Sequence, residues 1–75
     1  MKTAKELFEE LGYEKYGETT THIVYKNKED YYFIKFNLTY KSIMVHKPHT
    51  TFNLMNMKEL QAINKQVEEL GWLDD

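Results

Sequence analysis

The stretch TTHIVYKNKEDYYFIKFNLTYKSIMVHK, from Thr20 to Lys47, decides the fold of this 75-residue chain. Apolar and polar residues alternate along it with a period of two, which is typical of strands with one buried face. Polar residues interrupt the alternation at residues 27–30 and near residue 40, where turns are expected. We therefore predict three consecutive strands over residues 20–27, 31–38 and 41–47.

A fourth strand is predicted over residues 50–55, after a turn around Pro48. The register of each hairpin can be inferred because facing residues must lie on the same side of the sheet. The three expected hairpins pair Tyr25 with Tyr32, Phe36 with Ile43, and Val45 with Phe52. Each pairing keeps one apolar face continuous, so we predict an antiparallel meander of four strands.

Both ends of the chain carry an amphipathic helical pattern that stops at a glycine, in EELGY (Glu9–Tyr13) and EELGW (Glu68–Trp72). A capping residue with Glu three positions later opens each pattern, and apolar residues three and four apart follow it. The capping pairs are Thr3 with Glu6 and Asn56 with Glu59. With Gly12 and Gly71 as left-handed helix ends, we predict helices over residues 3–11 and 57–70.

The expected fold is α+β: a four-stranded antiparallel meander sheet with the N- and C-terminal helices packed on one face, in the order α-β-β-β-β-α. A chain of this length has room for a single domain, residues 1–75. It contains no cysteine, so disulfides and thiolate chemistry are excluded. Because two helices cover only one face of such a sheet, the opposite face is left without a covering element.

The uncovered face would present aromatic and aliphatic side chains among lysines and histidines, a larger apolar patch than an idle surface usually carries. An ordinary half-exposed sheet surface is the alternative interpretation. As a functional surface, it would bind a partner through Val24, Tyr31, Phe33, Lys35, Met44 and His46. The expected occupant is a second copy of the chain, giving a homodimer, since small domains often complete their cores by association, or a separate partner protein.

No constellation in the sequence points to catalysis. The single serine, Ser42, lacks a glycine-rich turn around it, and the three glycines form no phosphate-binding loop. The predicted register separates the three histidines and brings no carboxylate to them, so a metal site is not expected. We therefore predict a protein without enzymatic activity, with no catalytic, cofactor-binding or metal-binding residues and no small-molecule substrate.

Charge is distributed unevenly: residues 19–55 hold five Lys against two acidic residues, whereas both ends are acidic. Lysines among aromatic residues suit single-stranded nucleic acid, but the chain has no Arg for bidentate recognition of bases. Nucleic acid is therefore an alternative partner, less expected than a protein. A further alternative is that the glutamates of the helices imitate nucleic acid and inhibit a protein that binds it.

TAKELFEELGYE (Thr3–Glu14) and MKELQAINKQVEELGW (Met57–Trp72) resemble the conserved ends of a set of small proteins from phages and prophages of low-GC Gram-positive bacteria. The resemblance implies an origin in a mobile element and a cytoplasmic setting. It carries over no functional residues, because the middle of these proteins varies and their members are uncharacterised. The N-terminus also lacks the apolar run of a signal peptide or membrane span. We therefore expect a cytoplasmic accessory protein that does not contact the membrane and whose partner, if not a second copy, is a host or phage protein.

Overall fold

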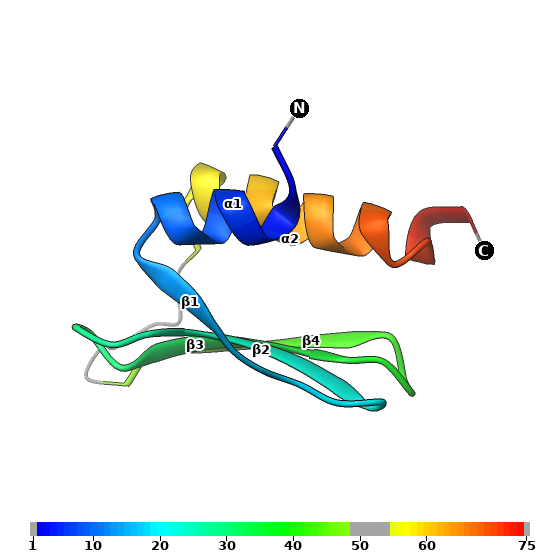
Figure 1. Cartoon of the computed structure of the whole chain (residues 1–75), viewed down its shortest axis with the longest axis horizontal. Coiled ribbons are helices and arrows are strands. Elements are labelled where there is room, and N and C mark those ends of the chain that lie inside the picture. The colour runs from blue at the N-terminus through cyan, green and yellow to red at the C-terminus, as the bar shows by residue number, and fades with distance from the viewer. Residues whose placement is uncertain (1, 49–54, 75) are drawn as a thin grey trace.

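The computed structural model describes residues 2–48 and 55–74 and arranges them in two layers, a sheet and a pair of helices (Figure 1). Its elements are α1 (Ala4–Glu10), β1 (Tyr13–Glu18), β2 (His22–Asn27), β3 (Tyr32–Asn37), β4 (Ser42–His46), α2 (Met57–Glu69) and the 3₁₀ turn η1 (Trp72–Asp74). The four strands pair antiparallel in the order β1-β2-β3-β4, and both helices lie on the same side of the sheet (Figure 1). The predicted α+β meander is thereby confirmed. Among the described helices, none has the length and apolar character needed to cross a membrane.

The first strand, β1, was not predicted from the sequence. Its residues, YEKYGE, show a buried position only at Tyr13 and lack the regular alternation of the other strands. The register against β2 shifts between Lys15 and Gly17, so Tyr16 is the extra residue of a β-bulge. A bulge breaks the period of two, which explains why the pattern did not reveal this strand.

The strand expected at residues 50–55 falls almost entirely outside the described residues. Met55, which the structure does describe, precedes α2 and belongs to no strand. The expected pairing of Val45 with Phe52 also lies outside the described part of the chain. The described sheet therefore reaches four strands by beginning at Tyr13.

The β2–β3 hairpin pairs Tyr25 with Ile34, so the predicted pairing of Tyr25 with Tyr32 is wrong by two residues. The cause is the Asn27 side chain, whose oxygen accepts hydrogen bonds from the backbone N–H groups two and three residues later, at 2.9 and 3.0 Å. This side-chain turn places the loop at residues 28–31, one position later than expected. Because the shift is an even number of residues, the same side chains still face the helices.

The β3–β4 hairpin pairs Phe36 with Ile43, as predicted. Asn37 repeats the role of Asn27 and accepts hydrogen bonds from the N–H groups two and three residues later, at 3.0 and 2.9 Å. The last residue of each loop has a left-handed backbone, with φ of 58° at Tyr31 and 54° at Lys41. The two hairpins thus share one turn design that includes a conformation unfavourable for non-glycine residues.

The helix ends match the prediction closely. Both capping boxes are present, with Thr3 and Asn56 each bound to the glutamate three residues later in both directions. Gly12 and Gly71 follow the helices with φ of 89° and 75°, and each donates its N–H to a carbonyl of the last turn. The repeated EELG segment is therefore a helix stop used twice.

The core fills the space between the layers. Phe8 of α1 stacks on Tyr25 of β2 with ring centroids 4.0 Å apart, and Phe36 of β3 meets both rings edge-on. The Tyr25 hydroxyl donates to Gln66 Oε1 of α2 at 2.7 Å, and burial raises the pKa of Tyr25 to about 12. Further buried apolar side chains are Tyr13, Ile23, Ile34, Ala62, Ile63 and Val67.

Candidate interaction surface

The face of the sheet that points away from the helices has no described element over it (Figure 1). On β2 and β3 the buried residues Ile23, Tyr25, Ile34 and Phe36 point toward the helices, so the residues between them point to the opposite side. We call that side the open face and define it by Tyr16, Val24, Lys26, Phe33, Lys35, Met44 and His46.

Five of the six residues predicted from the sequence come together there. Val24, Lys35 and Met44 lie in one cross-strand row, since Lys35 pairs with Val24 on one side and with Met44 on the other. In the adjacent row Phe33 pairs with His46, and the two ring centroids are 4.8 Å apart. In the first row a lysine therefore lies between two apolar side chains, and in the second row Phe33 lies between Lys26 and His46.

Tyr31 does not share this arrangement. The strand predicted at residues 31–38 begins at Tyr32, and Tyr31 is instead the left-handed last residue of the β2–β3 loop. The alternation that places Phe33 on the open face therefore does not extend to Tyr31. Its side chain is exposed, at 62 % of its maximum.

A hollow of about 230 Å³ lies in the open face, lined by Tyr16, Val24, Lys26, Phe33 and Lys35. Sequence reasoning missed Tyr16, because the bulge hides the strand that carries it. The Lys26 ammonium lies 5.0 Å from the centroid of the Tyr16 ring, a cation–π contact that joins β2 to β1. The bulge therefore adds an aromatic wall to the surface that the alternation predicted.

A cluster of buried polar groups connects the sheet to the start of α2, and the sequence did not reveal it. Lys47 donates to Glu59 Oε1 at 2.7 Å, and the Tyr13 hydroxyl donates to Glu59 Oε2 at 2.8 Å. The backbone N–H of Asn56 adds a third hydrogen bond to Glu59, at 3.0 Å. The Lys47 ammonium also lies 5.2 Å from the centroid of the Tyr32 ring.

The environment of this cluster shifts the pKa of two of its groups, the Glu59 carboxyl and the Tyr13 hydroxyl. Burial alone would raise the pKa of Glu59, but hydrogen bonds from Lys47, Asn56 and Tyr13 outweigh it and hold the pKa below its ordinary value. Burial and the neighbouring carboxylate raise the pKa of Tyr13. These contacts occupy both Glu59 oxygens, so we interpret the cluster as a structural tie between β1, the end of β4 and α2.

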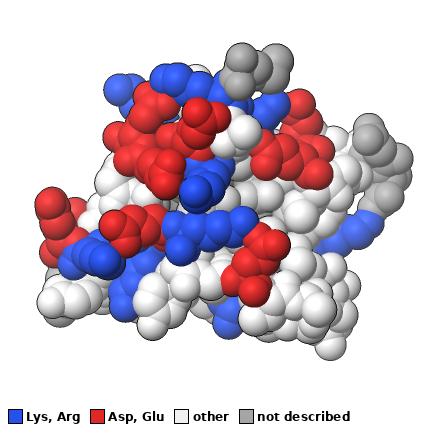
Figure 2. Space-filling view, viewed as in Figure 1, with Lys and Arg blue, Asp and Glu red and all other residues white. Residues whose placement is uncertain are grey.

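The glutamates of the helices are compensated locally. Glu69 accepts a hydrogen bond from the Ala4 N–H at 2.8 Å, so the carboxylate that opposes the dipole of its own helix caps the start of the other. Three more glutamates form ion pairs: Glu9 with Lys5 at 3.8 Å, Glu10 with Lys2 at 2.6 Å, and Glu68 with Lys65 at 3.3 Å. Figure 2 accordingly shows lysine and acidic side chains next to one another on the side that it displays.

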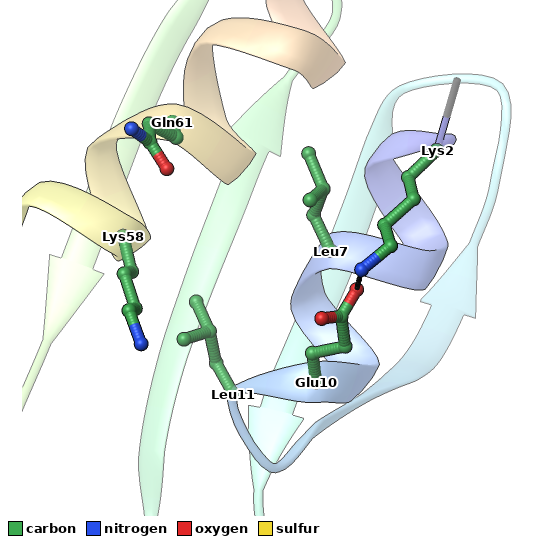
Figure 3. Close-up of a pocket in the computed structure, with 6 residues that line it drawn as sticks. All are labelled: Lys2, Leu7, Glu10, Leu11, Lys58 and Gln61. Carbon is green, nitrogen blue, oxygen red and sulfur yellow. Dashed lines mark ion pairs between the residues drawn. The ribbon is translucent and has the colours of Figure 1, made fainter.

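A second hollow, of about 290 Å³, lies between α1 and α2 (Figure 3). Leu7 of α1, Leu11 directly after α1, and the α2 side chains Lys58 and Gln61 line it. At its edge Lys2 and Glu10 bind each other, so these two opposite charges cancel. Nothing in this hollow selects a ligand, and we assign it no function.

The open face offers aromatic rings, aliphatic side chains, two ammonium groups and the His46 imidazole. These groups can contact a partner through apolar surface and through charge. In the described residues, no three histidine or carboxylate side chains are grouped as a metal site requires. Comparison with protein-family models, curated proteins and solved structures finds no match to this chain.

Proposed function

We propose that the protein is a non-enzymatic interaction module that acts through the open face. The observation that carries the proposal is the hollow lined by Tyr16, Val24, Lys26, Phe33 and Lys35, on a sheet surface with no described element over it. Aromatic side chains and Met that remain partly exposed in one patch are typical of contact surfaces. The structural role of the buried Glu59 cluster further favours the open face as the functional surface.

The resemblance of the two ends to phage and prophage proteins supports a more specific setting. We propose an accessory protein of a mobile element that works in the cytoplasm of its bacterial host. The compensated glutamates of the helices make imitation of nucleic acid the weaker alternative, because a mimic needs a field of one sign.

Footprinting of lysines tests the proposal before any partner is identified. All cations of the chain are lysines, so acetylation read by mass spectrometry samples the whole surface. We expect Lys26 and Lys35 to react less in cells that express the protein than in dilute purified protein. Lys5 of α1 and Lys58 of α2, which are both exposed in the helix layer, are the controls and should react equally in both. Protection confined to Lys5 and Lys58 would place the contact on the helices and overturn the proposal.

A second copy of the chain is another candidate occupant of the open face. Met44 favours it, because this apolar side chain is 55 % exposed in the middle of β4. Light scattering over a wide range of protein concentration would then report a dimer that Met44→Lys dissociates. Leu73→Lys is the control, since Leu73 is similarly exposed, at 69 %, in η1. A dimer that survives Met44→Lys would use a different surface.

A further inference from the structure

Charge distinguishes the possible occupants of the open face. Lys26 and Lys35 both line its hollow, and none of the described residues that line it is a carboxylate. Glu14, which pairs in register with Lys26, is bound by Lys28 at 3.0 Å, so this acid is already compensated. The open face therefore presents positive charge on a chain whose net charge is -2.

The lysines stand next to flat apolar rings. The Lys26 ammonium lies 5.0 Å from the centroid of the Tyr16 ring, and the Phe33 ring lies beside the His46 imidazole, tilted by 32° with centroids 4.8 Å apart. Lys35 lies beside Phe33 in the wall of the same hollow. Two ring platforms with an ammonium group at each is the combination that binds bases by stacking and phosphates by charge.

We infer that the open face binds single-stranded nucleic acid with little sequence preference. Bases stack on Phe33 and Tyr16, and the ammonium groups of Lys26 and Lys35 pair with phosphates. This inference rests on the proposed function, because it names the partner of the same surface. The chain has no Arg, so the cations act as point charges and do not read base edges in bidentate geometry.

The other occupants fit these features less well. A second copy on the same face would bring another Lys26 and another Lys35 into one interface and so add like charges to it. An acidic peptide would satisfy both lysines but would offer the rings no flat partner. A duplex keeps its bases stacked internally, so it could use only the charges.

The test is fluorescence anisotropy with a labelled oligothymidylate of about 12 nucleotides, a length within the usual range of such sites. Binding should weaken with salt, with a slope of log K against log salt of about -1.4, as two neutralised phosphates on a single strand require. Phe33→Ala should weaken binding roughly 5- to 150-fold, the effect of losing one stacking platform. Lys35→Gln should reduce the slope by about 0.7.

Matched controls separate recognition from folding. Tyr40→Ala removes a ring that is 80 % exposed in the β3–β4 loop and should leave affinity unchanged. Tyr16→Ala removes the second platform from a side chain that is 69 % exposed, so it reports on stacking even where Phe33→Ala fails to fold. A duplex of the same length should bind more weakly than the single strand.

Each contrary result has a definite meaning. Absence of binding at low salt overturns the inference, as does binding that neither Phe33→Ala nor Tyr16→Ala weakens. Binding of polyglutamate in place of the oligothymidylate overturns it too, while the open face remains a contact surface. The proposed function is tested separately: it would be overturned by lysine protection that is confined to the helices in cells.

Discussion

At the scale of single residues, two tyrosines in similar loops show how backbone conformation sets stability. Tyr31 adopts a positive φ of 58°, whereas the φ of Tyr40 is not positive. Both side chains are exposed, at 62 % and 80 %. The left-handed conformation costs a non-glycine residue about 1–2 kcal/mol, and glycine avoids that cost.

Tyr31→Gly should therefore stabilise the protein by about 0.5–1 kcal/mol, after the greater entropy of glycine in the unfolded chain is subtracted. Tyr40→Gly should destabilise it by about 0.4–1 kcal/mol, because there only the entropy changes. Urea denaturation of both variants measures the difference. Equal effects would mean that the Tyr31 backbone is not strained.

The buried ion pair between Lys47 and Glu59 is a second feature of single residues that sets stability. Both side chains are nearly inaccessible, at 10 % and 5 % exposure, so Lys47→Met should leave a buried carboxylate uncompensated and cost about 3–5 kcal/mol. Lys28→Met is the control, because Lys28 and Glu14 are largely exposed and their pair contributes at most about 1 kcal/mol. Urea denaturation measures the free energy of unfolding of both variants. Similar losses would mean that the Lys47–Glu59 pair contributes no more to stability than an exposed pair.

The same carboxylate predicts a dependence on pH. Because the folded state holds the pKa of Glu59 below its ordinary value of 4.5, Glu59 contributes stability above that value. This contribution is lost as the pH falls from 4.5 through the lower pKa of the folded state. Glu59→Gln should therefore be less stable at neutral pH and lose less stability on acidification. Urea denaturation at several pH values measures this. If Glu59→Gln lost as much stability below pH 4.5 as the unchanged protein, Glu59 would not be the source of the pH dependence.

At the scale of elements, glycines end both helices, but their surroundings differ. Gly12 and Gly71 both have positive φ, and a Cβ at Gly12 would also approach the Asn27 amide to 3.2 Å. Gly12→Ala and Gly71→Ala should each cost about 1 kcal/mol or more, with the larger loss at Gly12. Gly17→Ala is the control, since no positive φ and no atom within 4 Å opposes its Cβ. Thermal unfolding of the three variants gives the order, and a loss at Gly17 as large as at Gly12 would contradict it.

At the scale of the whole molecule, stability and the proposed binding reside on opposite faces of the sheet. Phe8 is completely buried between the layers, so Phe8→Ala should cost about 3–5 kcal/mol. Tyr16→Ala removes an exposed ring and one cation–π contact, and should cost about 1 kcal/mol or less. Urea denaturation measures both. A large loss in Tyr16→Ala would mean that the open face stabilises the fold.

Much of the architecture follows from local rules. The capping pairs at Thr3 and Asn56, the glycines at 12 and 71, and the alternation through β2, β3 and β4 depend on neighbours within one turn or one strand. For this reason the α+β class, the meander and five of the six candidate surface residues could be predicted. The even period of strands also kept the buried face correct when the register of Tyr25 was wrong.

The sequence by itself thus determined the helix ends, the three central strands and which side of each is apolar, because these are properties of consecutive residues. Only the tertiary structure decided that β1 joins the sheet through a bulge at Tyr16, that Lys47 meets Glu59, and that Glu69 caps α1. Each of these depends on groups brought together by packing, and no periodic pattern encodes such contacts. The aromatic hollow of the open face is the joint result, since alternation supplied Phe33 and the bulge added Tyr16.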